Sequence, residues 1–342
     1  MYELTSIQAQ NIVNKMMKDI PYNINIMDKN GIIIGSGNKE RIGTLHQGAA
    51  AAIKQRRIVE INKDEEFVKK GINLPIDING KIVGVVGITG EVKETRPFGN
   101  LVKSTVILLI EQSAAIEREN LEKNLKQDFF HSITEPSAVY SKELIDQALS
   151  YGIQLNNPSQ IVYAEFPYEV EEDTIKKDPV FKTSNTSLCF IVQDPNQTDE
   201  LTKQLEAEHP DAWLSISKMN KKISDGFFQA KSSMRILQGV FLNQKIISYE
   251  DCEFIADMSE LQRNNPKSER LIPLLEKHED LIKTLQVYLT CNMNANETAS
   301  RMIIHRNTLN YRLNRIHKIT GKDPKKILEL IELIFLLIHR VH

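Results

Sequence analysis

The C-terminal part of the chain carries the pattern that most restricts its fold, because short amphipathic helices are predicted there in close succession. The first has one apolar stripe at helical spacing, formed by Leu281, Leu285, Tyr288 and Leu289. A second, short helix is predicted over Glu297–Ile303, after a polar break rich in capping residues. A tight turn at Ile304–His305 leads into a third helix that begins near Arg306 and ends at Gly321. This succession predicts a helix-turn-helix within an all-α domain, 275–342.

The predicted third helix is basic and polar on the face opposite its apolar stripe of Leu309, Leu313 and Ile316. Between Arg301 and Lys322 there is no acid, although Asp and Glu outnumber Lys and Arg over the whole chain, 45 to 43. Arg pairs with guanine and Asn with adenine in the major groove, and Lys and Arg neutralise phosphates, so double-stranded DNA is the expected partner. A solvated basic helix face is the alternative interpretation.

We predict which side chains of this helix contact DNA. The full set is Arg306, Asn307, Thr308, Tyr311, Arg312, Arg315 and Lys318. Base contacts are expected from Arg306, Asn307 and Arg312, and phosphate contacts from Arg315 and Lys318.

A fourth, strongly apolar helix is predicted to follow the third. Asp323-Pro324 has the residue types of a helix cap and first turn, and the next residues are mostly Ile and Leu. Because this helix is apolar on most sides, we expect it to pack beneath the third helix or against a second copy of the chain.

The segment 297–324, "ETASRMIIHRNTLNYRLNRIHKITGKDP", resembles the PucR-type helix-turn-helix. The shared pattern is "TA…L..HRNT..YRL.RI...TG.D", in which Met302 replaces the usual Leu. The resemblance implies a transcription regulator.

Length and composition limit the classes of protein to which the chain can belong. A chain of 342 residues, 41% hydrophobic and 26% charged, is expected to form two or three soluble domains. Its longest aliphatic runs, 106–110 and 334–338, are far shorter than the ~20 residues of a membrane span, and no signal peptide is predicted. Three separated cysteines without a CxxC pair indicate a reducing environment. We expect a cytoplasmic protein without membrane contact, metal or cofactor.

Two β-hairpins and a helix are predicted near the N-terminus. The first hairpin spans 22–37 around the turn sequence Asp28-Lys29-Asn30-Gly31. The second spans Pro75–Gly90 around Asn79-Gly80, the strongest short-range hairpin signal. An Ala-rich helix lies between them in "RIGTLHQGAAAAIKQRR". Antiparallel strands interrupted by a helix favour a PAS-like or Cache-like sensor.

The start of this Ala-rich helix has residues suited to a small acid. Arg41 and His46 flank it, where free backbone N–H groups and the helix dipole favour an anion, and Arg offers two parallel hydrogen bonds to a carboxylate. Asn73 and the hydroxyl of Thr89 lie at the two ends of the second hairpin. The alternative is that Arg41 pairs with a surface acid, His46 is a structural histidine and the glycines serve turns.

Residues 1–125 resemble the sugar diacid recognition domain of carbohydrate diacid regulators, through "YNINIMD..G.II.SG...RIG..H.GA..AI" and "NLPI…IVGVVGITG". The resemblance implies sensing of glucarate, galactarate, glycerate or a related hydroxy acid, usually by an activator. The pocket positions it implies are Arg41, Gly43, His46, Asn73, Pro75 and Gly90, to which we add Thr89. Phe98 stands where the family has Tyr, which implies a change in specificity if that hydroxyl touches ligand.

A long helix and a third domain are predicted between the two ends. The helix covers Asn100–His131, about 48 Å at 1.5 Å per residue, and its apolar spacing is not a clean heptad. A two-stranded coil in a homodimer and an ordinary domain-edge helix both fit it. Residues 136–262 alternate strand-like and helical runs, typical of an α/β domain. Their position resembles the degenerate GGDEF-like domain of such regulators, and the hairpin Asp178–Phe190 lacks the glycines of a working cyclase.

The fold class predicted is therefore multi-domain α+β: a PAS-like or Cache-like sensor, a GGDEF-like α/β domain and an all-α helix-turn-helix domain. The expected function is ligand-responsive, non-enzymatic DNA binding by a homodimer or higher oligomer. An enzyme acting on a small acid and a signalling adaptor without DNA output are the alternatives.

Overall fold

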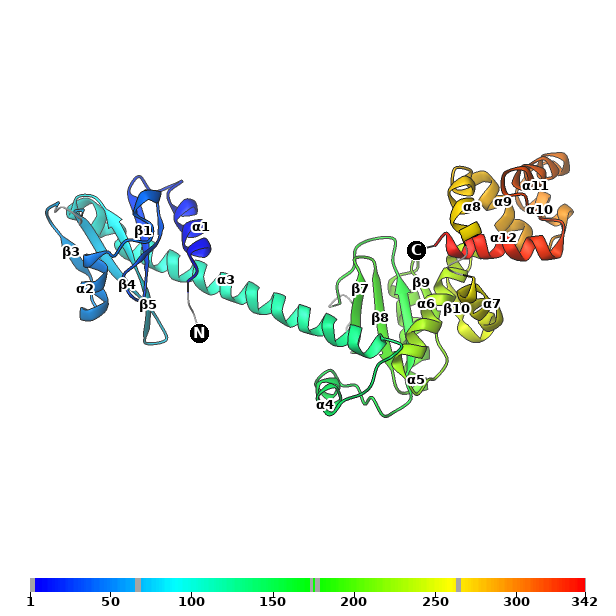
Figure 1. Cartoon of the computed structure of the whole chain (residues 1–342), viewed down its shortest axis with the longest axis horizontal. Coiled ribbons are helices and arrows are strands. Elements are labelled where there is room, and N and C mark those ends of the chain that lie inside the picture. The colour runs from blue at the N-terminus through cyan, green and yellow to red at the C-terminus, as the bar shows by residue number, and fades with distance from the viewer. Residues whose placement is uncertain (1–3, 65–68, 173–174, 176–178, 263–265, 342) are drawn as a thin grey trace. The chain divides into compact units, whose positions relative to one another are not determined.

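The computed structural model describes residues 4–64, 69–172, 175, 179–262 and 266–341 (Figure 1). The chain divides into two compact units, Met1–Lys123 and Asn124–His342, and each contains a five-stranded sheet with helices. The mixed α and β class predicted from the sequence is confirmed. Among the described residues, no helix combines the length and the apolar character that a membrane span requires.

The sheet of the first unit is built from the two predicted hairpins. Its strands, in the order β2-β1-β5-β4-β3, are β1 (Asn23–Asp28), β2 (Ile33–Ser36), β3 (Val59–Ile61), β4 (Gly71–Ile78) and β5 (Lys81–Thr89), with antiparallel neighbours throughout. Asn79 and Gly80 both have positive φ, 53° and 79°, as the tight turn between β4 and β5 requires. The three-residue strand β3 was not predicted, because so short a segment carries no measurable alternation.

Helices cover both faces of this sheet. The helices α1 (Ser6–Met16) and α3 (Val92–Thr134) pack on the face that carries Ile24, Ile26, Ile72 and Leu74. The Ala-rich helix α2 (Gln47–Gln55) packs on the other face, beside Met27 and Val85. The short 3-10 helix η1 (Lys39–Arg41) precedes α2. Because side chains alternate along a strand, residues 25, 73 and 87 share the α2 face.

The long helix α3 begins eight residues earlier than predicted and includes Pro97. Its N-terminal half contributes Val102, Val106 and Ile110 to the core of the first unit. Phe129, Phe130 and Ile133, near its C-terminal end, belong to a core of the second unit.

The second unit begins with a sheet in the order β10-β9-β6-β8-β7 (Figure 1). The strands are β6 (Gln160–Glu165), β7 (Val180–Ser184), β8 (Ser187–Val192), β9 (Trp213–Ile216) and β10 (Ile246–Ser248). The helices around it are α4 (Lys142–Ser150), α5 (Pro195–Glu208), α6 (Ile223–Val240) and α7 (Tyr249–Leu261). The predicted hairpin is present as β7 and β8, although Asp178 lies outside the described residues. A GGDEF-like assignment of this sheet stays a prediction.

Among the described residues, five further helices follow in the second unit, and all five contribute to one core. They are α8 (Pro266–Glu276), α9 (Glu279–Thr290), α10 (Ala295–Arg301), α11 (Arg306–Thr320) and α12 (Ile327–His339). The prediction that the last helix starts at Asp323-Pro324 was wrong. The Asp323 carboxylate accepts from the Lys325 backbone N–H in a turn, and the helix begins only at Ile327.

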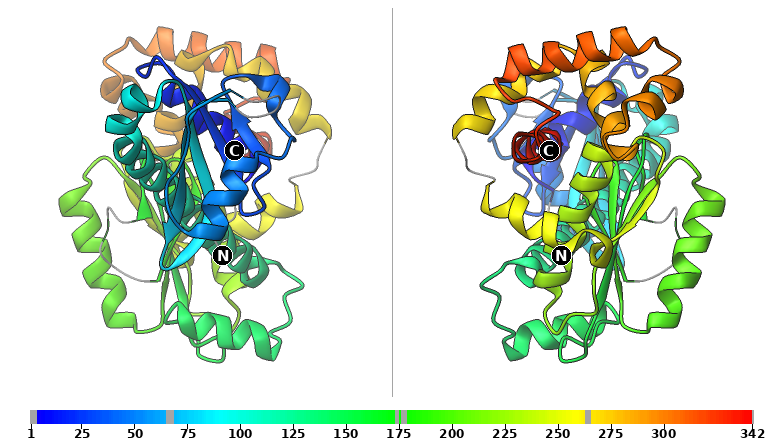
Figure 2. Two further views of the ribbon diagram at one scale, coloured as in Figure 1. Left: turned by 90° about the vertical axis from the view of Figure 1, so that its left-hand side faces the viewer. Right: turned by 90° about the vertical axis from the view of Figure 1, so that its right-hand side faces the viewer.

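The apolar character of α12 follows from its two partners. Leu330 and Leu333 lie in the core of the C-terminal helices, whereas Phe335 and Ile338 belong to the core beneath the middle sheet. The helix contacts α8, α6 and α7. Figure 2 shows the C-terminal helices, coloured yellow to red, from two other sides. As expected, one part of α12 shares a core with the helices of the helix-turn-helix, and another part packs against α6 and α7.

Candidate ligand site and candidate nucleic-acid interface

A row of polar residues crosses the first sheet beneath α2. Asn25 on β1 pairs in register with Gly87 on β5, and Gly87 pairs with Asn73 on β4. Ser36 on β2 is the neighbour of Asn25, and its hydroxyl donates to Asn25 Oδ1 at 2.6 Å. Asn25, Ser36 and Asn73 are each at most 2% exposed. Polar side chains in such a position cost free energy unless they are hydrogen-bonded.

Asn73 has an unsatisfied acceptor at the centre of this row. Its Oδ1 atom is buried and accepts no hydrogen bond from any residue that the structure describes. The first turn of α2 lies directly above it, because a Cβ atom on Gly48 would come within 2.6 Å of Asn73 Nδ2. Gly87 is similarly close, since a Cβ atom there would lie 3.2 Å from Asn73 Oδ1. The two glycines thus let the backbones of α2 and β5 lie close to a buried acceptor that lacks a donor among the described residues.

His46 is the N-cap of α2 and is held neutral. Its Nδ1 atom accepts from the Ala49 backbone N–H at 3.2 Å, which leaves Nε2 as the protonated nitrogen. Burial, helped by the nearby positive charge of Arg41, lowers the pKa of His46 to about 4. A neutral imidazole beside an Arg and the N-terminus of a helix offers donors to an anion.

Because the pKa of His46 is lowered, acid should destabilise the protein. The unfolded chain takes up a proton at His46 below about pH 6.5, and the folded chain does so only near pH 4. We expect the free energy of unfolding to fall between these two pH values by on the order of 3 kcal/mol. Urea unfolding across this window measures the loss. His46→Asn keeps a capping acceptor but does not titrate, so an undiminished loss in that variant would contradict the assignment.

The structure brings together some of the predicted pocket residues and separates others. Pro75 shares the α2 face with Asn73, and Thr89 Oγ1 accepts from Asn25 Nδ2 at 3.5 Å. Gly43 has a φ of 86° in the loop before α2, with no atom near its missing Cβ. Gly90 lies elsewhere, because its missing Cβ would meet Thr95 and Tyr22. Phe98 is 44% exposed, with its ring centroid 6.2 Å from that of Tyr22.

Two members of the polar row, Asn25 and Ser36, were missed by the sequence interpretation. The signal was present in β1, where Asn23 and Asn25 alternate with Ile24 and Ile26. On an exposed sheet this alternation marks the solvent face, and only the presence of α2 above it shows that the polar face is covered.

The helix-turn-helix is formed by α9, α10 and α11. Asn294 caps α10 by accepting from the backbone N–H groups of Asn296 and Glu297. His305 caps α11, and its Nδ1 atom accepts from the Asn307 N–H at 3.2 Å. Gly321, with a φ of 71°, ends α11. Leu309, Leu313 and Ile316 face the core as predicted.

The exposed face of α11 carries several of the predicted DNA contacts. Arg306, Asn307, Thr308 and Lys318 are exposed, and Tyr311 is 65% exposed. His305 is also exposed at the leading end of the helix, although it was not among the predicted contacts. In a helix-turn-helix the N-terminal residues of the second helix are those that reach base edges.

Arg312 and Arg315 were predicted to lie on this exposed face, but the structure places them at its edge. The Arg312 side chain is 25% exposed, its Nη1 donates to Thr284 Oγ1 at 3.3 Å, and its Nε lies 3.8 Å from Asp280 Oδ2 on α9. Arg315 Nη2 lies 3.4 Å from His278 Nδ1. Both arginines lie on the boundary between the inner and outer faces of α11, where acceptors on α9 and just before it hold them.

Ile303 occupies a strained position in the turn between α10 and α11. Its φ is 55°, a region that β-branched residues rarely adopt, and it is 93% exposed. We expect Ile303→Gly to raise the free energy of unfolding by about 1 kcal/mol, since glycine adopts this backbone without strain. Denaturant unfolding measures the change. Ile304→Gly is the matched control and should destabilise, because Ile304 packs against the core. Destabilisation by Ile303→Gly would contradict this assignment.

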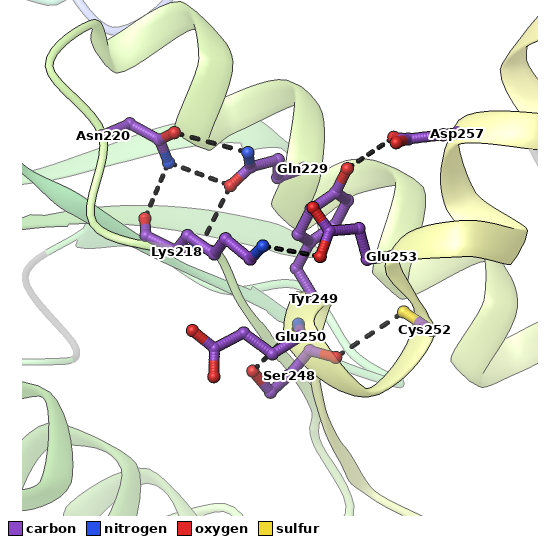
Figure 3. Close-up of polar contacts among 9 residues, drawn as sticks. All are labelled: Lys218, Asn220, Gln229, Ser248, Tyr249, Glu250, Cys252, Glu253 and Asp257. Atoms are coloured by element: carbon purple, nitrogen blue, oxygen red, sulfur yellow. Dashed lines mark hydrogen bonds and ion pairs between the residues drawn. The ribbon is translucent and has the colours of Figure 1, made fainter.

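A further polar cluster joins β10, α6 and α7 in the middle of the chain (Figure 3). Asn220 and Gln229 bond to each other, Lys218 pairs with Glu253 at 2.6 Å, and Tyr249 donates to Asp257 at 2.5 Å. Burial, followed by the hydrogen bond to Asp257, raises the pKa of the Tyr249 hydroxyl. Because these groups bond to one another, the cluster connects secondary-structure elements. Among the described residues, no cluster of His, Cys, Asp and Glu has the composition of a metal site.

Comparisons with known proteins match two separate parts of the chain to family models. Residues 4–133 match the model of the putative sugar diacid recognition family, and residues 281–338 match the PucR C-terminal helix-turn-helix domain. An uncharacterized protein of Haemophilus influenzae is 30% identical, over 95% of this chain and 96% of that protein. The carbohydrate diacid regulator of Escherichia coli is 28% identical, over 94% of each. The purine catabolism regulatory protein of Bacillus subtilis is 38% identical over 58 residues, 16% of this chain and 11% of that protein.

Proposed function

Because the chain belongs to the family of carbohydrate diacid regulators, we propose that it is a DNA-binding transcription regulator whose N-terminal domain senses a small hydroxy acid. The main support for DNA binding is the exposed N-terminal face of α11. Arg306, Asn307 and Thr308 lie there, at the point where a helix-turn-helix contacts base edges. We propose no enzymatic reaction for this chain. We further propose that it acts in the cytoplasm.

The effector site is proposed at the polar row beneath α2. A carboxylate fits the N-terminus of α2, beside Arg41 and the protonated Nε2 of His46. We propose that a ligand hydroxyl donates to the buried Oδ1 of Asn73, because a hydroxyl supplies the donor that this acceptor lacks among the described residues. A hydroxy acid offers both groups, and glucarate, galactarate and glycerate are the candidates.

Three domains follow from this proposal. They are a PAS-like or Cache-like sensor over 1–125, a GGDEF-like domain over 136–262 and the helix-turn-helix domain over 275–342. Effector binding can favour one arrangement of these domains only by the difference in its affinity for the two arrangements.

We propose a homodimer in which a second apolar face of α3 forms the contact between the two copies. Opposite the buried Val102 and Val106, Leu101 and Leu108 are 64% and 63% exposed. Together with Phe98 and Thr105 they are spaced alternately three and four residues apart, as in a two-stranded coil. This proposal agrees with the two-fold symmetry of most helix-turn-helix sites.

The dimer proposal predicts the effect of charges on this face. The double variant Leu101→Glu and Leu108→Glu should halve the mass in sedimentation velocity, because four carboxylates would meet across the pair. Asn100→Glu adds a charge on another exposed side of α3 and should leave the mass unchanged. A wild-type chain that sediments as a monomer at micromolar concentration would refute the proposal.

A thermal-shift screen tests the effector proposal. Glycerate, glucarate and galactarate are each added to the full chain, and a ligand that binds the folded state raises the melting temperature. At a hundred times its Kd an effector adds about 2.7 kcal/mol. The proposal requires a shift with at least one of these acids, and no shift with any of them would contradict it.

A further inference from the structure

A cavity of about 780 Å³ lies within the second unit, where the end of α6 meets the first helix of the helix-turn-helix. Trp213 from β9 and Phe241 just after α6 line one side. Asp280 and Lys283 from α9 line another, and Arg340 closes it after α12. Small-molecule sites in proteins have volumes of roughly 300–1,000 Å³ and combine apolar surfaces with a few polar groups. The cavity is in a different unit from the polar row beneath α2.

Arg340 contributes an unpaired hydrogen-bond donor to this cavity. Its Nε atom is buried and has no hydrogen-bond partner in the part of the chain that the structure describes. Buried donors are almost always paired, so an anion that reaches the Arg340 guanidinium would satisfy this N–H. Lys283, exposed on the same cavity, adds a second positive charge.

The residues that line the cavity also indicate which kind of group would be attached to a bound anion. Trp213 and Phe241 are half-buried rings, which suit a flat apolar or aromatic body. Glu279 and Asp280 line the cavity as well, and Asp280 lies beside the positive charge of Arg312. We propose that this cavity binds a planar, anionic small molecule, with its ring against Trp213 and Phe241 and its carboxylate or phosphate on Arg340 and Lys283.

The position of the cavity suggests that a bound ligand would affect DNA binding. This part of the inference rests on the proposed DNA binding by α11. Asp280 lines the cavity and also lies 3.8 Å from Arg312 Nε on α11. Gln286 lines it too, and its buried Nε2 donates to the Gly239 backbone carbonyl at the end of α6. A ligand here therefore touches residues that hold α9 to both α11 and α6.

Trp213 is the only tryptophan of the chain, so its fluorescence reports on the cavity directly. The full chain is titrated with benzoate and with adenosine monophosphate, each beside its uncharged counterpart, benzamide or adenosine. We expect a saturable change in Trp213 emission with one of the two anions and at least tenfold weaker binding of its uncharged counterpart. Which anion binds distinguishes a carboxylate from a phosphate ligand.

Variants test the assigned cations. Arg340→Gln and Lys283→Gln should each weaken binding about tenfold, because each removes a charge-assisted contact. Lys245→Gln is the matched control: Lys245 Nζ lies 4.0 Å from the Trp213 ring centroid, but Lys245 is not among the residues that line the cavity. Its affinity should equal that of the wild type. Thermal unfolding confirms that each variant is folded.

The proposal is overturned if neither anion gives a saturable change, if the uncharged compounds bind as tightly, or if Arg340→Gln binds like the wild type. No DNA is present in this titration. A failure of DNA binding would therefore leave the cavity proposal standing, and a failure of the titration would leave the DNA proposal standing.

Discussion

Replacing Arg306 with alanine is expected to weaken specific DNA binding by about tenfold to a hundredfold and to leave thermal stability unchanged. Arg306 is the first residue of α11 and is exposed. A bidentate contact to guanine contributes ~1–3 kcal/mol of discrimination, which gives this range. The measurement is fluorescence anisotropy on a duplex that the wild-type protein selects from random-sequence DNA, with thermal unfolding in parallel.

Arg312→Ala provides the matched comparison, because the two arginines differ in position. The contacts of Arg312 with Asp280 and Thr284 predict a loss of roughly 1 kcal/mol in the free energy of unfolding. Its discrimination between the selected duplex and a scrambled one should remain that of the wild type. If Arg312→Ala lost discrimination without losing stability, and Arg306→Ala kept it, the assignment of the exposed face would be wrong.

Asn73→Leu is expected to abolish the response to effector while keeping or raising the melting temperature. The buried Oδ1 of Asn73 has no donor among the residues that the structure describes, and an unsatisfied buried acceptor costs about 1–3 kcal/mol. Leucine has a similar shape and removes this cost, but it offers no acceptor to a ligand hydroxyl. The thermal shift that the effector produces in the wild type should disappear.

A control on the same strand separates the two faces of the sheet. Leu74 is the next residue of β4 and packs against α1 and α3 on the opposite face. Leu74→Ile should therefore leave the effector-induced thermal shift unchanged. A full shift in Asn73→Leu, or an unfolded Asn73→Leu protein, would show that Asn73 serves the fold and not the ligand.

The helix-turn-helix could be predicted because its determinants are local in sequence. The apolar spacing of Leu309, Leu313 and Ile316, the capping residue His305 and the terminal Gly321 together specify α11 within one short segment. The orientation of the Arg312 side chain could not be predicted in the same way. A helical wheel places Arg312 at the edge of the polar face, and only the position of Asp280 on α9 decides that it turns inward.

The polar row beneath α2 shows the same limit for a sheet. Asn73 was predicted from the family resemblance, whereas Asn25 and Ser36 join it through the registers of β1 with β5 and β2. Strand register across a sheet depends on contacts far apart in sequence, which a single sequence does not display. The second packing face of α12 is a similar case, since only the fold reveals the partner of Phe335 and Ile338.

The proposed function depends on the exposed N-terminal face of α11 as the DNA-reading surface, and one measurement tests this role most directly. The full chain, with and without the acid that gives the largest thermal shift, is titrated with its selected duplex and with a scrambled duplex at physiological salt. We predict at least a thousandfold preference for the selected duplex, lost with Arg306, Asn307 and Thr308 replaced together by alanine, and an affinity that changes when the acid is added. Equal affinities for both duplexes, or a preference that survives the triple replacement, would contradict the account.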